Sequence, residues 1–124
     1  MEGVTITNKA KDGSVLQAVF YPERGMNMVS YKRGAVEIID QGTRICYEER
    51  YSGLGPLVGP HFHHRYAQSI PQIKDEKLFP SIAFEHHRGE TDPFPGGIAR
   101  YVPWRYEATA TKIKGEINGE DVWK

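Results

Sequence analysis

Apolar and polar residues alternate along much of the chain, with a period of two. Because successive side chains of a strand point to opposite faces of a sheet, this period predicts β-strands. The turn-forming segments 11–13 (Lys-Asp-Gly) and 32–34 (Lys-Arg-Gly) separate the first alternating runs, which predicts two β-hairpins. The strands expected there are residues 4–7, 14–21, 26–31 and 35–40.

The rest of the chain also favours strands. Residues 44–47 and 78–85 are strand-like, and residues 106–114 alternate cleanly. The dipeptide Asn-Gly at 118–119 is the one most typical of a two-residue hairpin turn. No window shows a sustained helical period with capping residues. We therefore expect an all-β fold, an antiparallel β-sandwich or a barrel, with residues 1–124 forming a single β domain.

The hairpin predicted at 118–119 leaves only residues 120–124 for its second strand. One interpretation is a short edge strand that closes the domain. The other is an incomplete fold, which would be part of a longer protein or would complete its sheet with another chain. A homo-oligomer through this C-terminal hairpin is the corresponding prediction of a partner.

Composition and charge limit the partners and the cellular compartment that we expect for this chain. Sixteen basic and sixteen acidic residues give a net charge of zero, so neither nucleic acid nor an anionic membrane is expected as a partner. The single Cys46 cannot form an internal disulfide, and in a strand it is expected to be a small buried apolar residue. The N-terminus lacks the basic start and apolar run of a signal peptide, which predicts a cytoplasmic protein.

The segment 48–65 has the composition of a binding site. It holds three of the five histidines, three glycines and two prolines. Glycine lets a backbone approach a ligand closely, proline fixes the local geometry, and imidazole beside guanidinium offers directional donors that also carry protons. The candidate ligand-binding residues of this segment are His61, His63, His64 and Arg65.

Three segments resemble the galactose mutarotase-like superfamily, the aldose 1-epimerases and their relatives. Residues 20–40 look like the N-terminal double hairpin of those proteins, where a strand that ends near a glycine leads into the next hairpin. Residues 55–65 occupy the place of a glycine-rich loop that ends in an Asn-Arg pair. Residues 95–104, Pro-Gly-Gly-Ile-Ala-Arg-Tyr-Val-Pro-Trp, are similar to the family's His-Gly-Phe-Ala-Arg-x-x-x-Trp segment. The order and spacing of the three segments together carry the resemblance.

The resemblance implies the N-terminal portion of a β-supersandwich that binds a hexose or a hexose phosphate, without a metal or other cofactor. The implied substrate-binding residues are His61, His63, His64, Arg65, Arg100 and Trp104. Two positions depart from the family, because Gly96 replaces a histidine and His64 replaces an asparagine. The family's catalytic glutamate belongs to a C-terminal half that the resemblance does not cover, so the catalytic residues are unknown. If active, the chain would be an aldose 1-epimerase-like isomerase of carbohydrate metabolism.

A cupin-like metal-binding β-barrel is the alternative interpretation. Gly55, followed after five residues by His61 and His63, fits the opening of the first cupin motif. Histidines two positions apart on a strand share a face and can ligate one metal ion. The glutamate and histidine that complete the two cupin motifs are replaced by Gln68 and Arg100, so only two imidazole ligands would remain.

Each candidate residue also has a purely structural interpretation. Arg65 and Arg100 would then pair with carboxylates such as Glu48, and Trp104 would pack in the core or on a sheet face. The adjacent Glu48 and Glu49 do not indicate a glycoside hydrolase, because neighbouring residues of a strand face opposite ways and cannot flank one bond.

Overall fold

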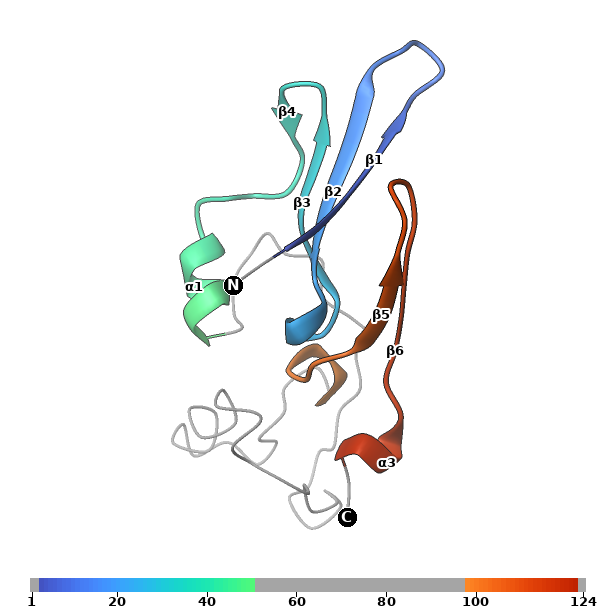
Figure 1. The fold of residues 1–124 in the computed structure, drawn as a ribbon. Helices are drawn as coiled ribbons and strands as arrows, with labels where there is room; N and C mark the ends of the chain where they lie inside the picture. The colour runs from blue at the N-terminus through green and yellow to red at the C-terminus, as the bar shows by residue number, and fades with distance from the viewer. Residues whose placement is uncertain (1–2, 51–97, 123–124) are drawn as a thin grey trace.

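The computed structural model describes residues 3–50 and 98–122, which form two antiparallel sheets (Figure 1). The first sheet has the strand order β1-β2-β3-β4, and the second is the hairpin β5-β6. The strands are β1 (Val4–Lys9), β2 (Val15–Tyr21), β3 (Asn27–Arg33), β4 (Val36–Glu37), β5 (Arg105–Ala108) and β6 (Ile113–Glu116). The helices are α1 (Arg44–Arg50), α3 (Gly119–Val122) and the 3-10 helices η1 (Pro22–Arg24) and η4 (Ile98–Arg100). An all-β fold with antiparallel strands is confirmed for the described residues, among which neither sheet is closed.

The β1–β2 hairpin forms where the sequence predicts it. Its turn contains Gly13 with a φ of 86°, and Asp12 accepts a hydrogen bond from the Ser14 N–H at 2.9 Å. Glycine reaches positive φ without strain, and aspartate bonds to the backbone two residues onward, so this tripeptide favours a tight turn. The resulting register pairs Val4 with Phe20.

A sharper connection joins β2 to β3, and we call residues 22–27 the 22–27 turn. Pro22 begins η1, where its fixed φ suits the first helical position. Gly25 and Met26 follow with left-handed backbones, at φ values of 71° and 55° respectively. A left-handed backbone is uncommon for a residue other than glycine, so the surroundings of Met26 must hold it in place.

A β-bulge interrupts the β2–β3 ladder beside this turn. The register shifts between Val19 and Phe20, which places Val29 between two paired residues of β3. A bulge leaves backbone groups outside the ladder, and such groups need another partner when they are buried. Gln41 supplies it, because its Nε2 donates a hydrogen bond to the Val29 carbonyl at 2.9 Å.

The second hairpin turns at residues 34–35, so only Gly34 of the predicted turn 32–34 lies in it, because β3 extends to Arg33; β4 is shorter than the expected strand 35–40. The Glu37 carboxylate accepts hydrogen bonds from the N–H groups of Tyr31 and Ile39, both at 2.9 Å. The chain therefore folds around this side chain after β4 instead of continuing the ladder. Burial raises the pKa of Glu37, but the hydrogen bonds from Ser30, Tyr31 and Ile39 outweigh it and hold that pKa below its usual value.

Residues 44–50 form α1, so the strand predicted for residues 44–47 is wrong. The turn before the helix is built by Asp40, whose carboxylate accepts hydrogen bonds from the Gly42 N–H at 3.0 Å and the Thr43 hydroxyl at 3.3 Å. Arginine and glutamate, which supply most of α1, are good helix formers. The helix has only seven residues, too few to show a sustained period in the sequence.

Because residues 44–50 form a helix and not the expected strand, different side chains of this segment are buried. Tyr47 is 0% exposed, whereas Cys46 is exposed, so the prediction of a buried Cys46 is wrong. Glu48 and Glu49 are now neighbours on a helix, where adjacent side chains also do not face each other. Glu48 and Glu49 therefore cannot flank one bond of a substrate on this helix either.

The alternating run 106–114 forms two strands with a turn between them, and not the single strand that was expected. The Thr109 hydroxyl accepts a hydrogen bond from the Lys112 N–H at 3.1 Å, and the Thr109 N–H donates to the Lys112 carbonyl at 2.8 Å. Threonine closes this turn without glycine or proline. The turn therefore lacks the residues that mark most turns in a sequence.

The hairpin predicted at 118–119 is also wrong, because α3 begins there. The Asp121 carboxylate accepts a hydrogen bond from the Asn118 N–H at 3.2 Å and forms an ion pair with Arg105 at 2.9 Å. These contacts hold the end of the described chain against β5. The C-terminal hairpin on which the homo-oligomer prediction depended is not formed among the described residues.

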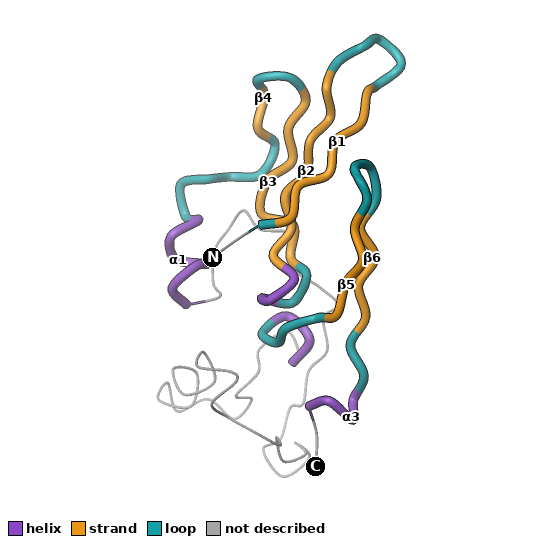
Figure 2. Tube along the Cα trace, viewed as in Figure 1, coloured by secondary structure: helices purple, strands orange, loops and turns teal. Residues whose placement is uncertain are grey.

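The core of the four-stranded sheet lies at one end, where α1 packs on it. Tyr21, Val29 and Tyr47 form a buried cluster, with Val19 packed against it. The β5–β6 hairpin runs beside β1, and a hydrogen bond from the Thr7 N–H to the Ala110 carbonyl joins the two sheets (Figure 2). Within the described ranges, no helix has the length and apolar character that crossing a membrane requires.

Candidate functional site

Two segments far apart in the sequence meet at the buried end of the four-stranded sheet. The Gly25 N–H donates a hydrogen bond to the Val102 carbonyl at 2.8 Å, and the Trp104 N–H donates to the Pro22 carbonyl at the same distance. We call residues 21–27, α1 and residues 98–104 together the junction. Both backbone bonds join the 22–27 turn to the segment that carries Arg100 and Trp104.

Gly25 allows this close approach because it has no side chain. A Cβ atom at this position would lie 2.4 Å from the Arg100 Cα and 2.5 Å from its carbonyl carbon. Real Cβ atoms do not approach backbone atoms so closely, so any larger residue would push the two segments apart. The left-handed φ of Gly25 strengthens the same requirement for glycine.

Arg100, a predicted site residue, lies at the end of η4 and is half-buried. Its guanidinium carbon is 4.9 Å from the centroid of the Tyr101 ring, a distance typical of a cation–π contact. Its carbonyl accepts a hydrogen bond from the Asn27 side chain at 3.2 Å. Glu48, one of the carboxylates considered as a partner of Arg100, forms its ion pair with Arg44.

Trp104, the other predicted site residue that the structure describes, is also half-buried. Its indole Nε1 donates a hydrogen bond to the Ala99 carbonyl at 2.9 Å. Its ring lies close to Gly115 of β6, where an added Cβ would come within 3.3 Å of the indole Cε3. The structural interpretation of Trp104 is therefore confirmed in part, since the indole closes the 98–104 segment and packs on the second sheet.

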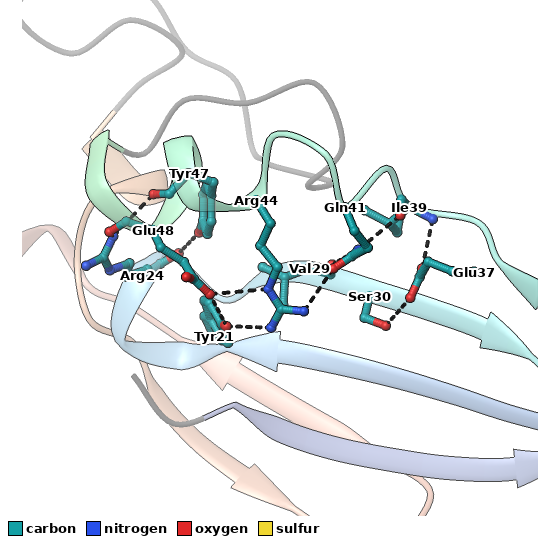
Figure 3. A network of polar contacts seen from close by, with 10 residues as sticks. All are labelled: Tyr21, Arg24, Val29, Ser30, Glu37, Ile39, Gln41, Arg44, Tyr47 and Glu48. Atoms are coloured by element: carbon teal, nitrogen blue, oxygen red, sulfur yellow. Dashed lines mark hydrogen bonds and ion pairs between the residues drawn. The ribbon is translucent and has the colours of Figure 1, made fainter.

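A polar cluster fastens α1 to the sheet next to this segment (Figure 3). The Arg44 Nη2 donates a hydrogen bond to the Tyr21 hydroxyl at 2.6 Å, which in turn donates to the Glu48 carboxylate at 2.8 Å. The Arg44 Nε also donates to Glu48 at 3.2 Å, and its Nη1 donates to Gln41 at 2.9 Å. Because all three nitrogens of Arg44 already donate within the chain, this cluster is a structural latch and not a ligand site.

The hydrogen bonds of the latch change the pKa values of its two charged residues, Glu48 and Arg44. The hydrogen bond from Tyr21, followed by that from Arg44, holds the pKa of the Glu48 carboxyl below its usual value. The hydrogen bond to Tyr21 correspondingly raises the pKa of Arg44 above its usual value. The latch therefore favours the charged forms of both residues.

Arg24 connects the 22–27 turn to the end of α1. Its Nη1 donates to the carbonyls of Tyr47, at 3.2 Å, and of Glu48. Carbonyls in the last turn of a helix lack partners within the helix and carry partial negative charge, so a guanidinium there is favourable. Arg24 therefore caps α1 and ties it to the turn that also receives residues 98–104.

The remaining predicted site residues lie outside the described residues. They are His61, His63, His64 and Arg65, and the same holds for Gly96 and for every histidine of the chain. Within residues 3–50 and 98–122, no group of three histidine, cysteine or acidic side chains is arranged to hold a metal ion. Of the predicted site residues, the structure therefore describes only Arg100 and Trp104, and their role in binding stays a prediction.

Sequence reasoning missed Asn27 and the latch residues of the junction. Asn27 is 1% exposed, and the sequence around it does not indicate its role, because two of its three partners, Tyr47 and Arg100, are distant in the sequence. The latch had one signal, the spacing of Arg44 and Glu48 by four residues, which suits an ion pair on a helix. This spacing brings two side chains together only on a helix, and residues 44–47 were predicted to be a strand.

Two open cavities are lined by described residues. One of about 240 Å³ lies on the β5–β6 hairpin, between Arg105, Tyr106 and Lys114 among others. One of about 170 Å³ lies between β1, β2 and Thr111 of the β5–β6 turn. Neither is lined by Arg100 or Trp104, so we place the candidate site by the resemblance and the junction contacts and not by cavity size.

Searches against protein-family models, curated proteins and solved structures find no match to this chain.

Proposed function

We propose that this chain is a carbohydrate-binding, aldose 1-epimerase-like protein that binds a hexose or a hexose phosphate beside residues 98–104. One observation carries the proposal. The segments 20–40 and 95–104 resemble two separate motifs of the galactose mutarotase-like superfamily, and their described parts are hydrogen-bonded to each other. The bonds from Gly25 to Val102 and from Trp104 to Pro22, both 2.8 Å, make this contact.

The chemistry of the segment suits a sugar. A guanidinium presents a planar set of donors that matches hydroxyl and phosphate oxygens, which is the role proposed for Arg100. An indole ring combines an apolar face with a polar edge, and the apolar face of Trp104 would pack against the sugar ring. His61, His63, His64 and Arg65 are proposed to complete the site. The proposal requires no cofactor.

Binding is the primary proposal, and mutarotation is the activity it would serve. Mutarotation requires a base that takes the proton of the anomeric hydroxyl and an acid that protonates the ring oxygen. We assign neither role to a described residue. A mutarotation assay with α-glucose and α-galactose tests this part separately.

Calorimetric titration tests the proposed site. We expect galactose, glucose or glucose 6-phosphate to bind the wild-type protein, and Arg100→Ala to weaken binding by about tenfold to a hundredfold, the worth of a charged hydrogen bond. Arg33→Ala is the matched control, because Arg33 is exposed at the opposite end of the sheet and pairs with Asp12. Equal losses in both variants would remove Arg100 from the site, and no binding of any of the three sugars would contradict the proposal.

Metal content separates this function from the cupin alternative. The measurement is mass spectrometry on protein purified without a histidine tag. The proposed function predicts that sugar binding is unchanged after treatment with a chelator. One zinc, iron or manganese ion per chain, lost together with the activity, would instead favour the metal-binding barrel.

A further inference from the structure

The Asn27 side chain lies at the centre of the junction. It is 1% exposed and begins β3, directly after the left-handed Gly25 and Met26. The two N–H groups of its Nδ2 are shared among three acceptors, the Arg24 carbonyl, the Tyr47 hydroxyl at 2.6 Å and the Arg100 carbonyl at 3.2 Å. One amide group therefore links the 22–27 turn, α1 and η4.

These contacts require a donor at this position. Two of the three acceptors around Nδ2 are backbone carbonyls, which cannot donate, so the orientation of the amide is fixed. The Tyr47 hydroxyl donates to the Arg24 carbonyl at 2.9 Å, and its oxygen accepts from Asn27 at 2.6 Å. A side chain of the same shape without donors would face the two carbonyl oxygens of Arg24 and Arg100 and repel them.

The Arg100 backbone is held from two sides. Asn27 binds its carbonyl, and Gly25 lies so close that even a methyl group would collide with it. The position of a backbone determines where its side chain reaches, and misplacing a binding group by about 1 Å weakens its contacts substantially. The contacts of Asn27 therefore bear on the guanidinium of Arg100 without touching it.

We propose that Asn27 is a positioning residue for ligand binding, whose buried amide holds the Arg100 backbone against the 22–27 turn and so directs the Arg100 side chain at the sugar. The ligand in this inference rests on the proposed function. That a donor at position 27 fixes residues 98–104 does not depend on any ligand. The effect on binding and the effect on residues 98–104 are therefore measured separately.

The test compares Asn27→Asp with Ser30→Ala. Aspartate keeps the shape of asparagine and lacks its N–H donors. Ser30 is the matched control, because it is 4% exposed on the same strand, and the partly buried hydrogen bond that Ser30→Ala removes goes to Glu37 of β4 and not to η4. Both variants are studied at a temperature where circular dichroism shows them folded, so that a lowered folded fraction does not reduce the apparent affinity.

The first measurement is calorimetry with galactose and glucose 6-phosphate. For Asn27→Asp we expect a dissociation constant raised about tenfold or more at an unchanged number of sites, and for Ser30→Ala an unchanged constant. A purely structural role would instead lower the number of competent sites at constant affinity. Wild-type affinity in Asn27→Asp would overturn the inference.

The second measurement is amide hydrogen exchange, which needs no ligand. The N–H groups of Gly25 and Trp104 make the bonds that join the two segments. In Asn27→Asp we expect both to exchange about tenfold faster than in Ser30→Ala, because the segment opens more often. Equal exchange in the two variants would overturn the positioning role. If the wild type binds neither sugar, the proposed function is wrong, and this measurement alone decides whether Asn27 fixes residues 98–104.

Discussion

The two ends of the four-stranded sheet are built differently. At the junction, Tyr21 and Tyr47 are almost completely buried, and α1, the 22–27 turn and η4 converge there (Figure 1). At the far end, which holds the β1–β2 and β3–β4 turns, Val15 is 45% exposed and Val36 is 66% exposed. One end is therefore a packed corner, and the other consists of two solvated hairpin turns.

The two ends also differ in how far apart in the sequence their bonded residues lie. The far end is held by bonds within its turns and between neighbouring strands, such as the Gly13 N–H to the Ala10 carbonyl at 3.0 Å and the Gly34 N–H to the Val15 carbonyl at 2.8 Å. The junction is held by bonds between distant residues, such as Asn27 with Arg100. Local contacts define turns and strand register, whereas long-range contacts exclude water and position side chains for a ligand. Substitutions at the two ends should therefore differ in size, and matched pairs test this.

The largest effect is expected at Tyr47. Its ring is 0% exposed and stacks on Tyr21 with 6.3 Å between centroids, so Tyr47→Ala should lower the free energy of unfolding by about 3 to 5 kcal/mol. Tyr106 is 49% exposed, and Tyr106→Ala should cost about 0.5 kcal/mol. Urea unfolding measures both. If Tyr47→Ala does not fold, Tyr47→Phe, which loses only the hydroxyl, should still cost about 1 kcal/mol. Equal costs for Tyr47→Ala and Tyr106→Ala would contradict the comparison.

Two glycines give the next largest difference. Gly25 and Gly34 both have left-handed backbones, but an added Cβ meets the Arg100 backbone at Gly25 and nothing within 4 Å at Gly34. Gly34→Ala should cost about 1 kcal/mol of backbone strain. Gly25→Ala should cost about 3 kcal/mol, because the collision adds to the same strain. Thermal unfolding of the two variants gives the comparison, and similar midpoints would show that residues 98–104 do not press on the turn.

The latch predicts a smaller, pH-dependent effect. The folded-state pKa of Glu48 is lowered, so its stabilisation is present above the unfolded value of about 4.3 and is lost as the pH falls through the folded value. Glu48→Gln should cost about 0.5 kcal/mol at pH 7, because the carboxylate is 40% exposed and solvent screens it. The measurement is the difference in unfolding free energy between wild type and variant at pH 7 and at pH 3. A difference that does not shrink at pH 3 would show that the ionised carboxylate does not hold α1.

The smallest effect is expected at the far end. Arg33 and Asp12 form an ion pair whose side chains are more than half exposed. The hydrogen bonds from Ser14, followed by that from Arg33, lower the pKa of Asp12. Exposed pairs contribute little and are screened by salt, so Arg33→Ala should leave the unfolding midpoint unchanged within error. A clear loss of stability that disappears in high salt would show that the far end depends on charge and not on its turns.

The sequence predicted the parts of the fold that local chemistry determines. The β1–β2 hairpin follows from Asp12 and Gly13, and the break after β2 follows from Pro22 and Gly25. The helix α1 was not predicted, because its seven residues are too few for a period and its stability comes from packing Tyr47 on the sheet. The turn between β5 and β6 was missed because Thr109 closes it by hydrogen bonds that threonine makes only in that context.

The candidate site depends on the order of the motifs, which comes from the resemblance. The resemblance selected residues 20–40 and 95–104, and their described parts are in contact through Gly25 and Val102. Asn27 was not predicted, because no local rule distinguishes an asparagine that donates to a carbonyl many residues away from one in a solvated turn. His61, His63, His64 and Arg65 remain predictions, because they lie outside the described residues.

Amide hydrogen exchange on the wild-type protein tests the central claim most directly, that residues 98–104 and the 22–27 turn form one packed unit. The four amides to compare are those of Gly25 and Trp104 at the junction and of Gly13 and Gly34 at the far end. We predict that Gly25 and Trp104 exchange slowly and with the same opening free energy, whereas Gly13 and Gly34 exchange faster through local opening. Exchange of Trp104 as fast as that of Gly13 would contradict the claim, and with it the placement of Arg100 on which the proposed site depends.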